Sequence, residues 1–362
     1  MTYQTTCVAS FEIHYHRFLD PSGNPTQLLP AFANDISILV ELYRMMLLTR
    51  TFDAKAIALQ RTGKMGTYPS TLGQEAISVA MGSAMLREDV LCPYYREYGA
   101  QLTRGVRMED ILLYWGGDER GSDFKVCRED FPICVPIASQ VLHATGVALA
   151  FKIRQQPRVA VAAIGDGGTS KGDFYEAINF AGVQHLPVVF VVNNNQWAIS
   201  MPLSEQTATQ TIAQKAIAGG VYGEQIDGND VIAMKEAMQR ALDKARQGGG
   251  ATVIEALTYR MCDHTTADDA RRYRPLEELE SYKKQDPVIR LRTYLAAQGA
   301  WDEQKEKALI HELNEKVQAA AQNYLNIPVC APETMFDYLY ATLPNALKAQ
   351  REEVKFFGGQ RG

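Results

Sequence analysis

The sequence predicts an α/β protein in which helices cover both faces of a parallel sheet. Three stretches are short and apolar, namely RVAVAAIG at 158–165, PVVFVVN at 187–193 and ATVIEALTY at 251–259. Such stretches are typical of strands buried on both faces, because a strand with one solvated face alternates apolar and polar residues. Helical patterns at 170–184 and about 231–247 separate the three strands, and this alternation is typical of a parallel sheet.

The other elements follow from apolar spacing and turn residues. Residues 11–15 alternate before the turn DPSGNP, which indicates a short strand or hairpin arm. Residues 116–136 mix charges with turn formers, so we expect an irregular loop, and the polar stretch 260–275 predicts an exposed loop. Apolar residues recur at helical intervals in four further segments, at about 36–60, 74–86, 108–115 and 139–154.

These patterns divide the chain into three parts. We expect an N-terminal arm at 1–35, the α/β domain at 36–275, and a C-terminal helical extension and tail at 276–362. The predicted fold class is α/β, a parallel sheet with helices on both faces, plus N-terminal and C-terminal helical extensions. A length of 362 residues suits one large domain with such appendages.

Composition argues against several classes of function. The formal net charge is −5, which disfavours nucleic acid and anionic membrane as main partners. No apolar run reaches the roughly 18 residues that a membrane-spanning helix needs. The six cysteines form no C-x-x-C pair, so neither a zinc site nor a disulfide framework is indicated. The first twenty residues have neither a basic region nor an apolar core, so we expect no secretory signal there, and we expect a reduced, cytoplasmic setting.

A glycine-rich turn with an acid inside it follows the first buried strand. The turn is Gly165-Asp166-Gly167-Gly168, and it precedes a helix, where backbone amides favour a phosphate group. The G-x-G-x-x-G pattern of dinucleotide-binding folds is absent, which disfavours a nicotinamide-dependent dehydrogenase. Asp166 would repel a phosphate unless a cation lay between them.

Three asparagines close the next buried strand. One helix and one strand separate Asp166 from Asn195, and parallel strands end at the same edge of a sheet, so these side chains can face each other. Mg²⁺ prefers oxygen ligands and commonly shares them between one or two carboxylates and phosphates. We interpret the pair as part of a Mg²⁺–diphosphate site, although a glycine turn alone would more often be structural.

This G-D-G turn and the later N-N pair resemble the thiamine diphosphate motif, and longer segments extend the likeness. In chain order these are GTYPSTLGQEA, PYYREYG, GDGGTSKGDFYEAINFAG, NNNQWAIS, IDGND, IEALTYR, DHTTADDARRYR and KQDPVIRLR. They are similar to the alpha subunit of the first component of 2-oxo acid dehydrogenase complexes, over about residues 36–344, and the pyruvate-specific members look nearest. The resemblance implies a thiamine diphosphate-binding fold, with thiamine diphosphate and Mg²⁺ as cofactors.

The resemblance assigns roles around the glycine turn. By this likeness Asp166, Asn195 and the backbone carbonyl of Trp197 are the protein ligands of the magnesium ion. Gly167 and Gly168 would contact the diphosphate through their backbone.

It also assigns roles to residues elsewhere in the chain. Tyr95 and Arg96 match the pair that holds the diphosphate, and the arginine fork can donate two hydrogen bonds to a phosphate. Val135 and Ile137 match the backbone positions that embrace the aminopyrimidine ring. His264 matches the loop histidine that reaches the diphosphate and helps to pass the acyl group to lipoamide, as suits an imidazole.

Some features depart from the family pattern. The loop GGDERGSDFK has no histidine, where relatives often carry one, and the turn is G-D-G-G where G-D-G-A is common. Pro69 stands where some pyruvate-specific relatives have a histidine near the substrate. Thr265 and Thr266 follow His264 in a loop whose hydroxyl is phosphorylated in mammalian relatives.

The chain has room for one sheet domain of this kind, so the resemblance implies half of an active site. A beta subunit would supply the glutamate that protonates the aminopyrimidine, in a heterotetramer of two alpha and two beta chains docked on a lipoyl acyltransferase core. The implied reaction is oxidative decarboxylation of pyruvate, a small 2-oxo acid, with acetyl transfer to the lipoyl group. Branched-chain 2-oxo acid (2-oxoisovalerate) dehydrogenase, acetoin dehydrogenase and a non-catalytic subunit that kept the fold are the alternatives.

Overall fold

The structure, a computed structural model, describes residues 5–358 and divides into two compact units, Met1–Ala321 and Gln322–Gly362. The boundary between these units falls inside helix α12 (Glu303–Leu325), and the divisions expected after residues 35 and 275 stay a prediction. The segment after residue 275 stays with the larger unit because helix α11 (Pro287–Ala297) packs against α1 (Ile36–Arg61) and α2 (Glu75–Ala84).

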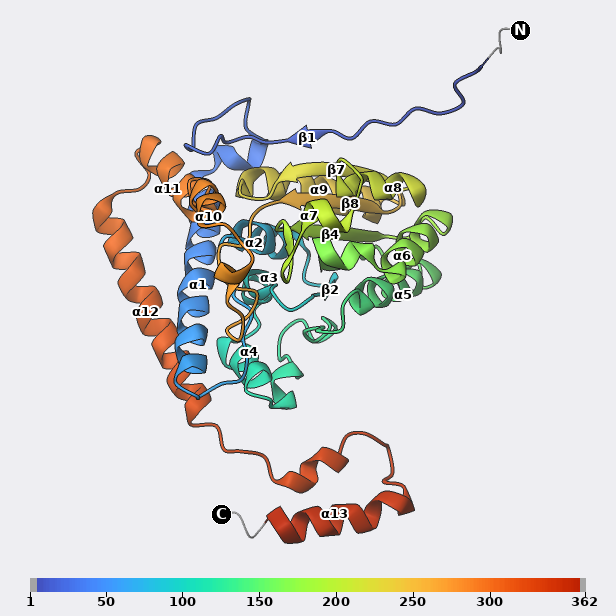
Figure 1. Cartoon of the computed structure of the whole chain (residues 1–362), viewed down its shortest axis with the longest axis vertical. Coiled ribbons are helices and arrows are strands. Elements are labelled where there is room, and N and C mark those ends of the chain that lie inside the picture. Colours follow the sequence, from blue (N-terminus) through green and yellow to red (C-terminus); the bar gives the residue numbers. More distant parts are fainter. Residues whose placement is uncertain (1–4, 359–362) are drawn as a thin grey trace. The chain divides into compact units, whose positions relative to one another are not determined.

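A six-stranded parallel sheet forms the centre of the larger unit (Figure 1). Each neighbouring pair of strands is parallel, so the carboxyl ends of all the strands lie at one edge, where open α/β sheets bind ligands. In sheet order the strands are β1 (Tyr15–His16), β7 (Tyr222–Asp227), β8 (Thr252–Leu257), β4 (Val188–Asn194), β3 (Ala160–Gly165) and β2 (Val90–Cys92).

Helices connect and cover these strands. Several begin at an aspartate whose side chain accepts hydrogen bonds from the first backbone amides, as Asp35, Asp230 and Asp286 do. The helices of this unit are α1 (Ile36–Arg61), α2 (Glu75–Ala84), α3 (Tyr98–Thr103), α4 (Met108–Trp115), α5 (Ser139–Ile153), α6 (Gly172–Val183), α7 (Leu203–Gln206), α8 (Lys215–Ala218), α9 (Val231–Arg246), α10 (Leu276–Lys283), α11 (Pro287–Ala297) and the first part of α12.

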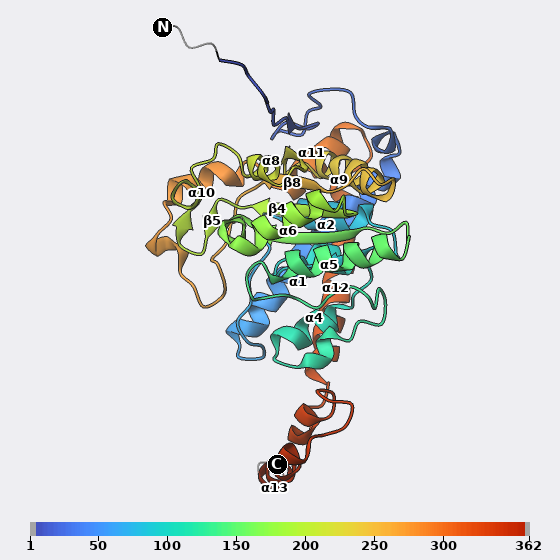
Figure 2. The same cartoon turned by 90° about the vertical axis from the view of Figure 1, so that its right-hand side faces the viewer.

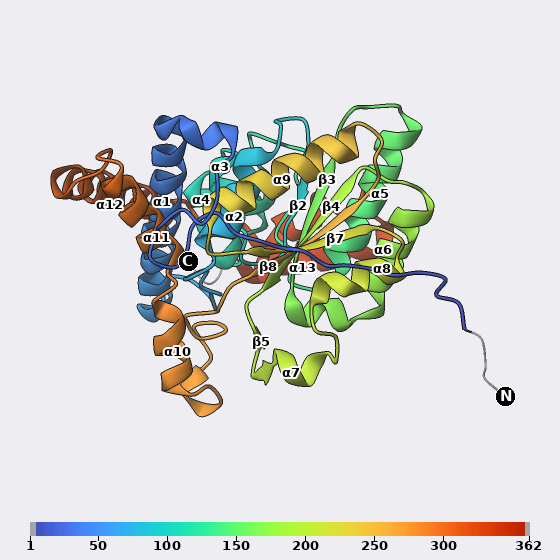
Figure 3. The same cartoon turned by 90° about the horizontal axis from the view of Figure 1, so that it is seen from above.

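Both faces of the sheet are buried. Successive strand residues point to opposite faces, yet Val161 and Val189 are as fully buried as their neighbours Ala162 and Phe190. Ala162 and Phe190 belong to a core cluster that α5 and α6 complete. Helix α9 packs against α2 and against β4, β7 and β8 (Figures 2 and 3). The predicted α/β fold with a doubly covered parallel sheet is therefore confirmed.

The three predicted buried strands are β3, β4 and β8, whereas the sequence patterns did not predict β2 and β7. Strand β2 has only three residues, which is too short for a pattern. Strand β7 carries two acidic residues that look incompatible with a buried strand. Glu224 is ion-paired with Arg240 and Asp227 with Arg290, so the protein accommodates both charges.

The prediction of an exposed loop at 260–275 needs correction, because most of this segment is half-buried or buried. Arg260 has no exposed surface, and Met261 is nearly buried. The segment pairs with the strap 66–72, since the Met261 amide donates to the Leu72 carbonyl at 3.3 Å and the Thr266 amide donates to the Tyr68 carbonyl at 2.9 Å. A polar sequence can therefore be internal when its partner lies far away in the chain.

The smaller unit contains the end of α12, a 3₁₀ turn η6 (Pro332–Phe336) and helix α13 (Asn345–Gly358). Within it, Arg351 forms an ion pair with Asp337 at 3.1 Å. Across the described residues 5–358, no helix combines the length and the apolarity needed to cross a membrane.

Candidate functional site

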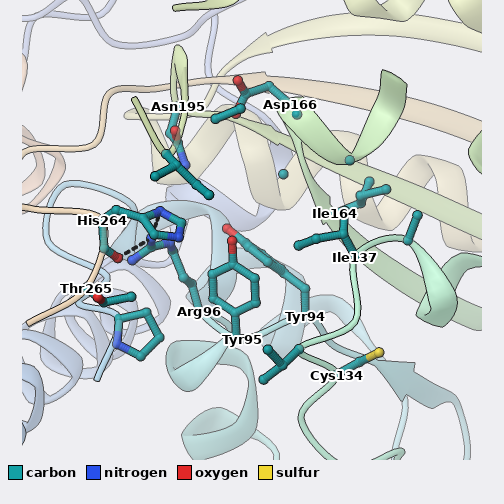
Figure 4. A pocket seen from close by; sticks show the side chains of 18 of the residues that line it. Tyr94, Tyr95, Arg96, Cys134, Ile137, Ile164, Asp166, Asn195, His264 and Thr265 are labelled. Atoms are coloured by element: carbon teal, nitrogen blue, oxygen red, sulfur yellow. Dashed lines mark hydrogen bonds between the residues drawn. The ribbon is translucent and has the colours of Figure 1, made fainter. Parts of the chain in front are cut away.

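A cavity of about 450 Å³ opens at the carboxyl edge of the sheet. Figure 4 shows Asp166 and Asn195 at the upper side of this cavity, with His264, Arg96 and Tyr95 below them. The lining includes all ten residues that the sequence singled out, namely Tyr95, Arg96, Val135, Ile137, Asp166, Gly167, Gly168, Asn195, Trp197 and His264. Residues up to 169 positions apart in the chain are thus brought to one place.

Strand register positions Asp166 beside the asparagines. Gly165 pairs with Asn193 across β3 and β4, so the residues that follow each strand leave the sheet at the same level. Asp166 is 2% exposed and begins the 3₁₀ turn η3 (Asp166–Ser170). Burial raises the pKa of Asp166 to about 6, although the Gln206 side chain acts in the opposite direction. A buried carboxylate of this kind favours a cation nearby.

The two glycines after Asp166 leave no room for side chains. A Cβ on Gly167 would lie 2.5 Å from the Ala198 Cβ, and one on Gly168 would lie 2.6 Å from the Ile164 Cγ1. The backbone of this turn is therefore packed closely between β3 and the hairpin of β5 (Trp197–Ala198) and β6 (Met201–Pro202).

Asn195 is held by its neighbours. Its Nδ2 donates to the Gln74 Oε1 at 3.2 Å, and its Oδ1 accepts from the Trp197 amide at 3.2 Å. The residue after it, Gln196, has a positive φ of 72°, which turns the chain back toward the cavity. These contacts fix which atom of the Asn195 side chain is the oxygen and hold it among the lining residues.

Arg96 and His264 meet directly. The Nη2 of Arg96 donates to the His264 carbonyl at 2.6 Å and lies 3.1 Å from the His264 Nδ1. The Nη1 of Arg260 lies 3.4 Å from the same Nδ1. Burial, together with the charges of Arg96 and Arg260, lowers the pKa of His264 to about 3. Because both neighbours are donors, Nδ1 is the acceptor and the neutral ring carries its proton on Nε2.

Further hydrogen bonds, made by Asp268 and Arg260, hold the loop that carries His264. Asp268 accepts hydrogen bonds from the His264 amide at 2.9 Å and from the Tyr273 hydroxyl. Arg260 donates to the Tyr273 oxygen at 2.7 Å and to the Ile199 carbonyl at 2.8 Å. This network gives His264 a defined position although it lies in an irregular segment.

Comparison with known proteins identifies the family. The family model described as "Dehydrogenase E1 component" matches residues 43–333, which is most of the chain. The chain belongs to the dehydrogenase E1 component family. It is an oxidoreductase of the 2-oxo acid dehydrogenase E1 type, and its relatives include alpha subunits.

Relatives of this E1 chain carry more than one substrate name. This chain is 42% identical over 322 residues to the "Pyruvate dehydrogenase E1 component subunit alpha" of Acholeplasma laidlawii. The matched region covers 88% of this chain and 92% of the relative. This chain is 40% identical over 348 residues to the "3-methyl-2-oxobutanoate dehydrogenase subunit alpha" of Mycobacterium tuberculosis. That match covers 96% of this chain and 95% of the relative. The pyruvate dehydrogenase alpha subunit of Staphylococcus epidermidis is 39% identical over 342 residues, covering 94% and 92%.

Membership in this family implies dependence on thiamine diphosphate, and the lining of the cavity fits that group. A diphosphate needs donors and a cation, and the E1 chain offers the Arg96 guanidinium, a closely packed glycine turn and one buried carboxylate. No cluster of three His, Cys, Asp or Glu side chains suited to a metal occurs among the described residues. A carboxylate, an amide oxygen and a backbone carbonyl suit a hard cation that also takes phosphate oxygens.

Sequence reasoning missed several residues of this site. Gln206 donates to the Asp166 Oδ2 at 3.1 Å, and its own Oε1 is buried without a partner among residues 5–358. Gln74 holds Asn195, as described above, and Trp115 and Cys134 line the far wall of the cavity. No short-range pattern marks these side chains, because each comes from a different part of the chain.

Proposed function

We propose that this E1 chain is the alpha subunit of a pyruvate dehydrogenase first component, which decarboxylates pyruvate with thiamine diphosphate and Mg²⁺ and passes the acetyl group to a lipoyl group. The observation that carries the proposal is one cavity that joins the Asp166–Asn195 pair to the Arg96–His264 pair. The first pair offers oxygen ligands, and the second offers donors to an anion.

The role that we propose for each residue follows from its position in the cavity. Asp166, Asn195 and the Trp197 carbonyl hold Mg²⁺, and Trp197 is itself nearly buried. When bound, thiamine diphosphate supplies the electron sink that decarboxylation of a 2-oxo acid requires. The Arg96 guanidinium and the amides of Gly167 and Gly168 hold the diphosphate, and Tyr95 closes its side.

Val135 and Ile137 are the proposed clamp for the aminopyrimidine ring. Both line the cavity, yet they are 46% and 43% exposed. The Ile137 carbonyl accepts a hydrogen bond from the Lys171 Nζ at 2.9 Å, which ties this segment to the start of α6. Exposed apolar residues at the rim of a cavity suit a site that a second chain completes.

His264 is the proposed proton-transfer residue during acyl transfer. Its neutral ring carries the proton on Nε2, the atom that the Arg96 and Arg260 contacts leave available. A bound diphosphate would add negative charge near the two arginines and so favour protonation of the ring. The added proton would go to Nδ1, which would then give up its contacts with the two guanidinium groups, and the ring could release a proton from Nε2.

A beta subunit is the proposed partner, because the described lining of the cavity includes no acid apart from Asp166. The glutamate that protonates the aminopyrimidine is therefore expected from that subunit, in a heterotetramer of two alpha and two beta chains. The lipoyl acyltransferase core would receive the acyl group.

A second candidate substrate is 3-methyl-2-oxobutanoate. Thr67, Pro69, Trp115 and Cys134 line the cavity together and are mostly apolar. The Pro69 ring cannot donate a hydrogen bond, and its carbonyl is occupied by the Tyr98 hydroxyl at 3.1 Å. Such a wall suits a branched aliphatic side chain, although relatives with pyruvate names are as similar as the branched-chain relative.

The test uses the alpha chain produced together with its beta subunit. Acylation of a lipoyl domain is measured with pyruvate, 3-methyl-2-oxobutanoate and acetoin, with and without thiamine diphosphate and Mg²⁺. We expect activity only when both cofactors are present, with the highest kcat/KM on pyruvate. A preference for 3-methyl-2-oxobutanoate would select the second candidate. Cofactor-independent activity, or no activity on any of the three, would contradict both.

A further inference from the structure

Lys215 is a buried cation that the proposed reaction does not use. It is 5% exposed and begins α8. Its ammonium group donates to the Thr169 carbonyl at 2.9 Å and to the Thr169 Oγ1 at 3.0 Å. Burying an ammonium group costs free energy, and an apolar side chain of similar size often serves stability as well, so the presence of a lysine here needs another explanation.

Thr169 belongs to the glycine turn that borders the cavity. This turn, η3, contains Asp166, Gly167 and Gly168, which all line the cavity. Thr169 is 1% exposed, and its hydroxyl donates to the Asp166 carbonyl at 2.7 Å. Because the hydroxyl has a single proton, it can only accept the hydrogen bond from Lys215. Lys215 is thus linked to Asp166 through Thr169.

The backbone that carries Lys215 is anchored to the sheet. It follows the 3₁₀ turn η4 (Ile212–Gln214), in which the Ala213 amide donates to the Glu255 Oε2 on β8 at 2.9 Å. The next residue, Ala216, is fully buried in the core cluster that also contains residues of β3 and β4. The ammonium group therefore connects a short turn beside the cavity to a segment that the core holds in place.

The charge of Lys215 is also coupled to the site. Burial lowers the pKa of Lys215, whereas the carboxylates of Glu255 and Asp166 act in the opposite direction. Among residues 5–358, the cavity lining includes neither Lys215 nor Thr169, so both act on the turn from behind. A fixed positive charge at this place adds to the attraction of the turn for an anion.

We propose that Lys215 is a positioning residue for the diphosphate site: through Thr169 it fixes the turn that bears Asp166, Gly167 and Gly168. Its long aliphatic stem reaches the turn from α8, and its ammonium group can donate to both Thr169 oxygens at once. Removal of this group should weaken cofactor binding while every proposed binding group stays in place. The positioning role rests on the proposed function, whereas the link between Lys215 and the turn does not.

A second buried lysine provides a matched control. Lys235 on α9 is 7% exposed, and its Nζ donates to the Ser83 carbonyl at 3.0 Å and to the Ser83 Oγ at 3.2 Å. Burial lowers its pKa as well. Ser83 lies near the end of α2, whereas Gln74, which holds Asn195, precedes the start of that helix. Lys215→Met and Lys235→Met therefore remove the same kind of contact, but only the first variant removes it beside the site.

The experiment uses the complex of alpha and beta chains with Lys215→Met, Thr169→Val, the double variant and Lys235→Met. Hydrogen exchange in the peptide that contains residues 165–170 is measured without cofactor. Thiamine diphosphate affinity is measured by calorimetry with Mg²⁺, together with kcat at saturating thiamine diphosphate and the urea midpoint. Thr169→Val keeps the lysine and the shape of the side chain, so it carries the same test if Lys215→Met does not fold.

We expect Lys215→Met to speed hydrogen exchange in this peptide and to weaken thiamine diphosphate affinity by about 10-fold, with kcat at saturation within about twofold of wild type. Lys235→Met should change neither the exchange of this peptide nor the affinity, although its effect on the urea midpoint should be similar. Thr169→Val should also weaken binding. The loss in the double variant should be smaller than the product of the two single losses, because both changes break the same link.

Wild-type exchange or wild-type affinity in Lys215→Met would overturn the proposal. An equal loss of affinity in Lys235→Met would also overturn it, because the loss would then reflect stability alone, and so would losses that multiply in the double variant. If wild type does not bind thiamine diphosphate but Lys215→Met still exchanges faster, the proposed function and the positioning role fail, while the link to the turn stands.

Discussion

At the scale of single residues, the arginine pair around His264 decides the chemistry that this ring can do. The Nδ1 atom faces two guanidinium groups, and the backbone amide of His264 is held by Asp268. A histidine in this setting is not free to accept a proton from solvent at neutral pH. Its reactivity is therefore expected to depend on what binds beside the arginines.

We predict that His264 stays uncharged from pH 5 to 8 without cofactor, because burial, Arg96 and Arg260 lower its pKa to about 3. Nitrogen NMR of histidine-labelled protein, assigned with His264→Gln, should show a neutral ring with the proton on Nε2. Titration of this signal near the ordinary histidine pKa of about 6.5 would show that the ring is not enclosed as described.

His264→Ala tests the proposed role in acyl transfer. We expect decarboxylation, followed with an artificial electron acceptor, to fall less than acetyl transfer to a lipoyl domain, with a loss of about 10²-fold in the transfer step. The unfolding midpoint should change little because the ring is only partly buried. Equal losses in the two steps would argue that His264 acts in cofactor binding alone.

At the scale of elements, a buried acid on α1 supports the strap that borders the cavity. Asp53 accepts hydrogen bonds from the Tyr68 and Ser70 hydroxyls, at 3.0 and 2.5 Å, and from the Thr71 amide at 2.9 Å. The strap in turn pairs with the segment of His264 through Tyr68 and Thr266. Position and stability of the site are therefore linked to a helix outside it.

We predict that Asp53 makes the stability depend on pH. Burial raises its pKa from 3.8 to about 6, so the folded protein holds this proton more tightly than the unfolded chain. Wild type should lose about 2 kcal/mol relative to Asp53→Asn as the pH rises from 4 to 6. Urea unfolding at several pH values measures this difference. If the difference in unfolding free energy between wild type and Asp53→Asn did not change with pH, Asp53 would be ionised at low pH in the folded state.

Two helix glycines make a matched test of packing. A Cβ on Gly182 in α6 would lie 2.0 Å from the Gly219 carbonyl oxygen, whereas a Cβ on Gly146 in α5 would meet nothing within 4 Å. We expect Gly182→Ala to destabilise by about 1–3 kcal/mol and Gly146→Ala to stabilise by about 0.5–1 kcal/mol. Thermal unfolding measures both, and a neutral Gly182→Ala would show that α6 can move away.

At the scale of the whole molecule, local patterns were enough to predict the fold class. The apolar runs of β3, β4 and β8 and the helices between them specify a parallel sheet with two covered faces. The sequence patterns did not predict strand β7, because its acids are neutralised by Arg240 and Arg290, which lie outside the strand in the sequence. The burial of Arg260 was not predicted for a similar reason, since one of its hydrogen-bond partners, the Ile199 carbonyl, lies in a distant segment.

The site was predictable where its residues belong to motifs and was missed where they do not. Asp166 and Asn195 could be paired because both follow buried parallel strands, and Arg96 and His264 came from the family resemblance. Gln206 could not be found in this way. Its importance lies in its hydrogen bond to Asp166, which only the three-dimensional structure shows.

The most direct test of the central claim is thiamine diphosphate binding by two matched aspartate variants. Asp166→Asn removes the charge at the cavity, whereas Asp173→Asn removes a partly exposed charge next to Lys171 on α6. Calorimetric titration of the alpha–beta complex with Mg²⁺ present should show a loss on the order of 100-fold or more for Asp166→Asn and almost none for Asp173→Asn. Wild-type, Mg²⁺-dependent affinity in Asp166→Asn would contradict the account.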